Sequence, residues 1–280
     1  MTATLIVARL TFREAVRRRI LLAALFFGLL FLAVYALGFN LIRVEVQREA
    51  DGPSIIAHSE FFGFILMAGL YVINFLTVMM TVLTSVDTLS GEITTGTIHT
   101  LASKPVHRRE ILLGKWLGYA GMLTLYLLMM AGGVLAIVYL SAGYMPGGAL
   151  RGLGLMWLNV MLLLSLSLLG GAVLSTLANG VLVFGMYGVA FVGGWIEQVG
   201  SFIENEAAIS VGTVASLLLP SEALWKRAAY EMRSPIMGAV AFGNPFVGLS
   251  VPSTLMIVYA VGYMLVVLAL AIRQFNSRDL

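Results

Sequence analysis

The sequence predicts an all-α, polytopic membrane protein with six transmembrane helices. Hydrophobic residues make up 60% of the 280 residues and charged residues only 11%, and the mean hydropathy is +0.96. A soluble chain carries roughly 25% charged residues, so this composition excludes an ordinary soluble domain. Several apolar runs also reach the length of about 20 residues that a helix needs to cross the hydrocarbon core.

Residues 1–19 are expected to form an interfacial elbow helix at the membrane surface. On a helical wheel Leu5, Phe12 and Val16 share one narrow sector, with arginines beside it. A basic amphipathic helix of this kind binds anionic headgroups. The alternative is a cytoplasmic extension of the first span. The apolar run 20–41 is longer than a signal-peptide core and no small-residue cleavage site is evident near its end, so we expect a retained transmembrane helix.

The six expected spans are connected by loops whose charges set the orientation. The spans cover residues 20–41, 62–85, 116–142, 155–177, 181–196 and 254–272, and a tight turn at residues 178–180 joins the fourth to the fifth. With the N-terminus inside, 11 of the 17 basic residues are cytoplasmic. Because basic residues favour the cytoplasmic side, we expect both termini in the cytoplasm.

The region 197–253 is expected to lie outside as short re-entrant helices. Its apolar run, residues 209–219, is too short to span the membrane. Pro220 ends this run, and Ser221 is expected to cap a following helix that runs through Tyr230. The alternative is a plain extracytoplasmic loop.

The predicted spans contain no Asp, Glu, Lys, Arg or His. Because intramembrane charges usually mark ion or proton paths, their absence argues against ion-coupled transport. The chain has no cysteine, no phosphate-binding loop of the GxxxxGK[ST] type and no histidines at metal-ligand spacing, so we expect no catalytic or metal site. Basic residues beside membrane helices do not indicate nucleic-acid binding. The pairs Gly114/Gly118 and Gly185/Gly188 are expected to allow close helix packing.

The best-organised polar segment is residues 86–115, the expected cytoplasmic loop between spans two and three. Thr88 or Ser90 is expected to cap a short helix, and Glu92 lies in its first turn, where a carboxylate favours the helix dipole. Gly96 interrupts the helix, and Pro105 suits the first turn of the next helix. A solvated loop with positive-inside charges is the alternative, but it does not explain this order of elements.

In this loop the sequence resembles the ABC-2 type permeases, the membrane subunits of ATP-binding-cassette exporters, and in particular the branch that includes the NosY-like permeases. The family pattern often has Arg and Glu where this chain has Ile93 and Thr94. The resemblance is carried by Ser90-Gly91-Glu92, Gly96-Thr97, Leu101, Ser103-Lys104-Pro105, Arg108-Arg109-Glu110-Ile111 and Leu113-Gly114-Lys115.

The resemblance implies a single ABC-2 type transmembrane domain over residues 1–280, in which the loop 86–115 holds a coupling helix that seats in a groove of an ATPase subunit. It implies a non-enzymatic half-transporter in a prokaryotic inner membrane, paired with a second permease chain as a homodimer and with two ATPases that bind the ATP and Mg. Membrane lipids and an extracytoplasmic protein are further expected partners. The ATPase-coupling residues would be Ser90, Gly91, Glu92, Gly96, Thr97 and Leu101, and the basic end of the loop would be Lys104, Pro105, Arg108, Arg109 and Lys115.

Two other functions stay open at this point. In one, ATP-driven motion acts on an extracytoplasmic partner through residues 197–252 without passing cargo, as the NosY-like resemblance allows. In the other, the chain is a membrane-embedded enzyme whose outer face gathers Glu197, Glu204, Glu206 and Lys226.

Overall fold

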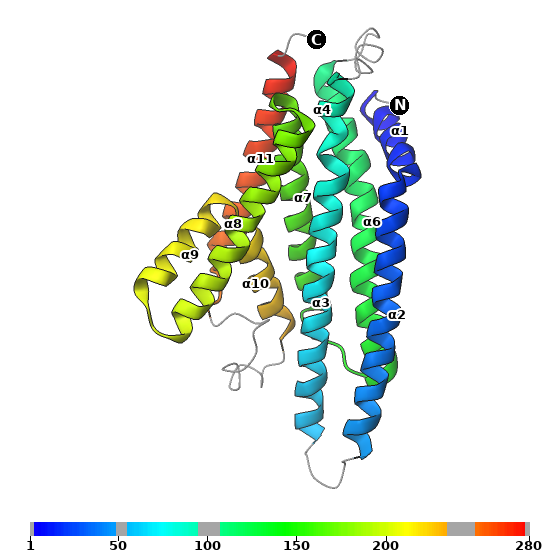
Figure 1. Cartoon of the computed structure of the whole chain (residues 1–280), viewed down its shortest axis with the longest axis vertical. Coiled ribbons are helices and arrows are strands. Elements are labelled where there is room, and N and C mark those ends of the chain that lie inside the picture. The colour runs from blue at the N-terminus through cyan, green and yellow to red at the C-terminus, as the bar shows by residue number, and fades with distance from the viewer. Residues whose placement is uncertain (1–2, 49–54, 95–106, 234–249, 278–280) are drawn as a thin grey trace.

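A computed structural model describes residues 3–48, 55–94, 107–233 and 250–277, and every regular element among them is a helix. The predicted all-α fold class is confirmed. The helices, shown in Figure 1, are α1 Ala3–Arg17, α2 Arg19–Arg48, α3 Ile55–Ser85, α4 Asp87–Thr94, α6 Arg108–Ala142, α7 Ala149–Val173, α8 Thr176–Phe202, α9 Glu206–Leu218, α10 Ser221–Met232 and α11 Thr254–Ser277.

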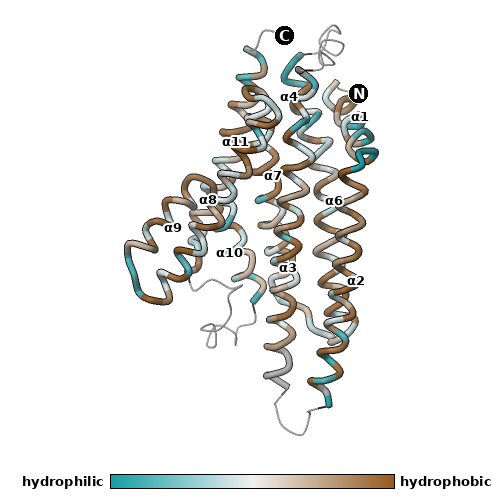
Figure 2. Tube along the Cα trace, viewed as in Figure 1, coloured by the Kyte–Doolittle hydropathy of each residue, from teal (hydrophilic) through white to brown (hydrophobic). Residues whose placement is uncertain are grey.

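Six of these helices are long and apolar enough to cross a membrane: α2, α3, α6, α7, α8 and α11. Even α11, with 24 residues, is about 36 Å long at 1.5 Å per residue, and the hydrocarbon core is about 30 Å thick. Hydrophobic residues follow these helices along most of their length, whereas hydrophilic residues gather at α4 and where α1 meets α2 (Figure 2).

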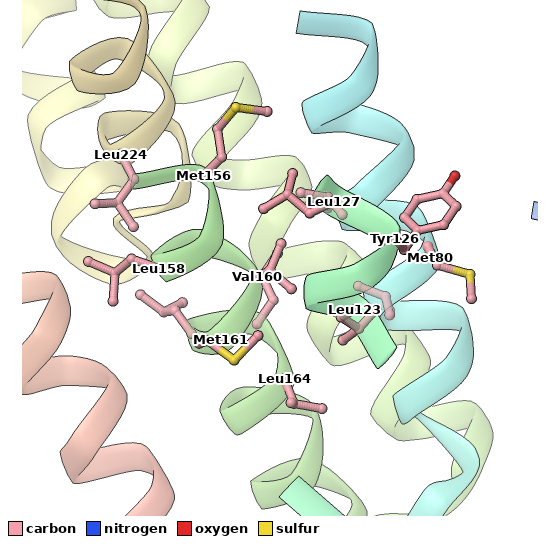
Figure 3. Packing of buried hydrophobic residues seen from close by; sticks show 14 of the residues in the cluster. Met80, Leu123, Tyr126, Leu127, Met156, Leu158, Val160, Met161, Leu164 and Leu224 are labelled. Carbon is pink, nitrogen blue, oxygen red and sulfur yellow. The ribbon is translucent and has the colours of Figure 1, made fainter. Parts of the chain in front are cut away.

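Helix α7 lies at the centre of the bundle. In its most apolar window 78% of the residues are buried, against 11% for the corresponding window of α2 and 17% for that of α11. It packs against α3, α6 and α10, and Figure 3 shows Leu158 of α7 beside Leu224 of α10 and Val160 of α7 beside Leu127 of α6. Since all long helices are apolar on every side, α7 is the core helix, and α2 and α11 offer their outer faces to lipid.

The helix α1 is packed on the bundle by one stripe of its residues. Val7, Thr11 and Ala15 are its buried residues, at the spacing of four that marks one helix face. They lie against α6 where Gly114 and Gly118 leave room for them. Leu5 and Val16 of the expected apolar sector do not take part in this packing, and their side chains remain available to lipid. A helical wheel groups residues by polarity alone. The packed face of α1 depends instead on Gly114 and Gly118 of α6, which leave room for small side chains.

Two predicted local features are corrected by the helix ends. The chain does not turn at residues 178–180: α7 ends at Val173 and α8 begins at Thr176, so that Asn179 lies inside a helix. Ser221 is the first residue of α10 and does not cap it, because Pro220 occupies the capping position without a side-chain hydrogen bond.

The region before the last span is structured, with α9 and α10 bent by 104° at their junction. Trp225 of α10 is buried and meets the ring of Tyr71 edge-on at 5.3 Å. In Figure 1, α9 and the adjoining part of α8 lean away from the bundle of α2, α3 and α6. The helices α1 and α4 and the C-terminal end of α11 lie together at the opposite end, which we call the α4 end.

The close approach of α1 to α6 gives a first prediction. A Cβ atom at Gly118 would lie 2.7 Å from the backbone oxygen of Ala8, so Gly118→Ala must displace α1. We expect a loss of about 1–3 kcal/mol in the free energy of unfolding, the usual cost of overpacking, measured by denaturation in mixed micelles. The matched control is Gly132→Ala on the same helix, because no atom lies within 4 Å of that Cβ position. Equal effects of the two substitutions would contradict the contact.

Candidate functional site

The site is built on a run of buried hydroxyl groups where α3 continues into α4. Each donates to the carbonyl oxygen four residues earlier, at 2.7 to 3.2 Å, so that burial leaves them satisfied. The predicted capping role of Thr88 and Ser90 is therefore wrong, since both hydroxyls bond backward along the chain. The residues are Thr77, Thr81, Thr84, Ser85, Thr88 and Ser90.

Helix α4 is wedged against α7 and the start of α8. Leu89 is fully buried, and its Cβ atom lies 3.3 Å from the position that a Cβ at Gly171 would take. The hydroxyls of Ser90 and Thr176 are 2.8 Å apart, and Thr176 Oγ1 donates to Asp87 Oδ1 at 3.1 Å. Asp87 at the start of α4 is thus hydrogen-bonded to α8, and Ser90 contacts the same threonine.

Asn179 is the central polar residue of this contact, and the sequence analysis did not find it. Its side chain is fully buried, and Nδ2 donates to the carbonyl oxygens of Val86 (3.0 Å) and Ser167 (2.9 Å). Val86 stands between α3 and α4, and Ser167 is on α7, so one amide holds three helices to α8. Gly170 provides the space for that amide, because a Cβ there would collide with Asn179 Oδ1.

A buried ion pair connects α4 to α6. Lys115 Nζ donates to Glu92 Oε1, and the Lys115 side chain is only 3% exposed. Lys115 was expected at the end of a cytoplasmic loop, but its side chain lies inside the bundle. A charge removed from water needs a paired and hydrogen-bonded partner, so this pair fixes the distance between α4 and α6.

The junction of α1 and α2 also reaches α4. Arg18 pairs with Glu14 at 2.8 Å and lies 3.8 Å from Asp87 Oδ2. Asp87 thereby receives contacts from Arg18 on one side and from Thr176 on the other. The short helix α4 is held by polar contacts to the α1–α2 junction, to α6 and to α8.

The structure brings some predicted site residues together. Ser90, Glu92 and Lys115 meet around α4, and Gly91 stands where a Cβ would collide with the Asp87 carboxylate. Arg108 Nη1 donates to the carbonyl oxygen of Asn276 on α11 at 3.4 Å, away from this cluster, and Arg109 is exposed. Gly96, Thr97, Leu101, Lys104 and Pro105 lie outside the described residues.

A second polar cluster lies around α10, at the other end of α8. Lys226 Nζ donates to Glu197 Oε2 (2.9 Å) and to the carbonyl oxygen of Gly194 (3.0 Å), and Ser250 Oγ donates to Glu197 Oε1. Glu222 is buried beside them over Gly194. We call these four side chains, Glu197, Glu222, Lys226 and Ser250, the α10 cluster.

Of the outer-face set predicted for an enzyme, only Glu197 and Lys226 come together. Glu204 and Glu206 are exposed beyond the end of α8, and Glu222 was not predicted as a member. The prediction of charge-free helices also needs correction, because α8 extends to Phe202 and so includes the buried Glu197. The charges stay near helix ends, where the cost of holding them in a membrane is smallest.

Burial raises the pKa of Glu222 to about 7. The nearby Lys226 opposes this shift and Glu197 adds to it. Glu222 belongs to α10, which forms no candidate span by itself and passes the test of length and hydropathy only together with α9. The α10 cluster therefore holds one carboxylate that changes charge near neutral pH.

Helix α8 runs from the polar contacts around Asn179 to the α10 cluster. Asn179 and Glu197 are 18 residues apart on this continuous helix, a distance of about 27 Å along its axis. No group of three or more His, Asp or Glu side chains in the described residues could hold a metal ion. The arrangement suits transmission of movement.

Comparison with known proteins gives one family. A family model described as "ABC-2 family transporter protein" matches residues 5–280, which is nearly the whole chain. No curated protein gives a match to this sequence.

The Lys115–Glu92 pair gives a second prediction. Lys115→Met should lower the free energy of unfolding by about 3–5 kcal/mol, because it leaves the Glu92 carboxylate without its buried counter-ion. Adding Glu92→Gln to that variant should recover a large part of the loss. A double-mutant cycle measured by denaturation in mixed micelles tests this, with exposed Arg109→Met as the control. Strictly additive effects would show that the two groups are not coupled.

The pKa of Glu222 gives a third prediction. Because its pKa is raised from 4.5 to about 7, the folded state holds the proton more tightly than the unfolded state does. This stabilisation is complete below pH 4.5 and is lost as the pH rises through 7, by up to about 3 kcal/mol. The unfolding temperature should thus fall between pH 5 and pH 8, and Glu222→Gln should flatten this slope. Exposed Glu206→Gln is the control, and an unchanged slope in Glu222→Gln would refute the assignment.

Proposed function

The chain belongs to the ABC-2 transporter family, and from this membership we propose that it is the permease of an exporter whose ATP hydrolysis takes place on a separate ATPase subunit. The match over residues 5–280 is the observation that carries the proposal. A permease of this family is a transport component and generally not itself an enzyme. The structural support is the position of α4, a short helix at one end of the bundle held between several long helices.

We propose that force from the ATPase enters at α4 and the segment that follows it. Residues Ser90, Gly91 and Glu92, with Gly96, Thr97 and Leu101, would form the coupling surface, and Lys104, Pro105, Arg108, Arg109 and Lys115 its basic end. Within the described part of this set, Glu92 is turned toward Lys115. Its proposed role is therefore to fix α4 to α6, so that a push on α4 also moves α6.

The movement would then reach the opposite end of the molecule through α8. Asn179 and Thr176 connect α4 to the start of α8, and Glu197 connects the far part of α8 to α10. Rocking of α8 would open or close a path beside it. In this proposal the α4 end and both termini are cytoplasmic, α9 and α10 are extracytoplasmic or re-entrant, and the membrane is a prokaryotic inner membrane.

A second copy of the chain is the proposed partner within the membrane. Gly185 and Gly188 on α8 have no atom within 4 Å of a Cβ position, although small residues at such spacing commonly serve close helix packing. They line an apolar groove of about 460 Å³ together with Val189 and Val192. A homodimer with two ATPases, which bind ATP and Mg, would bring two such surfaces together.

An alternative function is mechanical action on an extracytoplasmic partner, as in the NosY-like branch. The observation that favours it is the α8–α9 unit, which leans out of the bundle and is fixed to α10 by the buried Glu197–Lys226 pair (Figure 1). A continuous cavity through the assembled dimer would favour export, and a closed interior with a partner protein on α9 and α10 would favour mechanical action.

Crosslinking in intact cells tests the proposed coupling surface, our fourth prediction. A photoreactive residue at Thr97 or Leu101 should trap a protein that contains the GxxxxGK[ST] phosphate-binding loop. The same residue at exposed Arg151, at the opposite end of the bundle, is the control and should not. Gly96→Trp should abolish transport-coupled ATP hydrolysis and leave membrane insertion unchanged.

The mass of the crosslinked or co-purified complex measures the subunit count. Two permeases with two ATPases are expected. If Thr97 and Leu101 never trap a nucleotide-binding partner, or if ATPase stimulation survives both Gly96→Trp and Glu92→Lys, the coupling proposal is wrong.

A further inference from the structure

The helix α1 has two faces of different character. One face, formed by Val7, Thr11 and Ala15, is buried against α6. The opposite face is exposed and mixes arginines with large apolar side chains, among which Ile6 is 48% and Leu10 is 55% exposed. A face of this composition is suited neither to a protein core nor to water alone.

The exposed face contains a groove of about 620 Å³, which is large enough for a phospholipid headgroup. Arg13 and Arg17 are one helical turn apart, so their guanidinium groups lie on the same side of α1. Three guanidinium groups and one carboxylate give the groove a net charge of +2. Its lining residues are Leu10, Arg13, Glu14, Arg17 and Arg18.

The charges of this groove are only partly neutralised within the chain. Arg18 is paired with Glu14 and lies near Asp87. Arg13 and Arg17 are exposed and form no ion pair with any acidic residue in the part of the chain that the structure describes. They are therefore available to an anion that approaches from outside.

The position of the groove selects the kind of anion. It lies directly before α2, whose apolar span begins at Arg19, and thus at the depth of the lipid headgroups. The exposed Val16 and Ile20, toward the start of α2, match acyl chains, whereas a soluble acidic protein would offer no apolar complement at this depth. Charge and apolar surface together indicate a lipid.

We propose that this groove on α1 binds the headgroup of an anionic phospholipid in the leaflet at the α4 end. Arg13 and Arg17 bind the phosphate by charge-assisted hydrogen bonds, and Arg18 closes the far side. The site is independent of the ATPase coupling proposed above, because it needs only α1 packed on α6.

The test, our fifth prediction, uses the full chain purified in detergent and titrated with dioctanoyl phosphatidylglycerol, dioctanoyl phosphatidylcholine or sodium phosphate. The unmodified chain should bind the phosphatidylglycerol most tightly. The double variant Arg13→Gln with Arg17→Gln should bind it about 30-fold more weakly, from a contribution of about fivefold for each basic residue near an anionic surface.

The matched control is Arg48→Gln with Arg151→Gln, two exposed arginines near the opposite end of the bundle, which should leave the affinity within about twofold. Arg13→Lys with Arg17→Lys should retain most of the binding, and it tests the site even if the glutamine variant does not fold. The proposal is overturned if the glutamine variant and the control bind equally well. It is also overturned if phosphatidylcholine or inorganic phosphate binds as tightly as phosphatidylglycerol.

Discussion

The buried amide of Asn179 is the interaction on which the arrangement of the α4 end depends. In a membrane every backbone polar group must find its partner inside the protein. Where α3 gives way to α4, the Val86 carbonyl accepts from Asn179 Nδ2, and the same nitrogen donates to Ser167 on α7. One side chain of α8 therefore joins the start of α4 to α7, and the Lys115–Glu92 pair and Thr176 add further contacts to α4. On α7, the space that a Cβ atom would take at Gly170 or Gly171 is filled by the Asn179 amide and by Leu89.

The charges divide the molecule into two polar ends and an apolar middle. Lys115 and Glu92 are paired at the α4 end, and Lys226 and Glu197 are paired at the α10 end. Each pair joins two helices, and α8 is hydrogen-bonded near both ends. A buried pair is costly to break, so both pairs fix the helices that they join. The architecture is that of a member of the ABC-2 transporter family.

The surfaces that remain exposed are as informative as the core. The outer faces of α2 and α11 are apolar along most of their length and suit lipid contact. Gly185 and Gly188 leave an apolar groove on α8 that suits another helix. The exposed face of α1 carries arginines among its leucines and suits the headgroup layer. Each surface thus has the chemistry of a different neighbour.

The sequence by itself determined the fold class, the number of long apolar helices and the ABC-2 resemblance, because hydropathy, charge and loop motifs are local properties of the chain. It also predicted short helices before the last span, from the apolar run 209–219 and the break at Pro220. Only the tertiary structure shows which residues are partners in hydrogen bonds and ion pairs. An asparagine in an apolar segment can bond to any nearby carbonyl, so the role of Asn179 could not be read from its neighbours in sequence. Lys115 has the same character as other basic residues of its loop, and only the folded structure shows that it is buried and paired with Glu92. The packed face of α1 was set by the glycines of α6, about 100 residues away, and no periodicity within α1 contains that information.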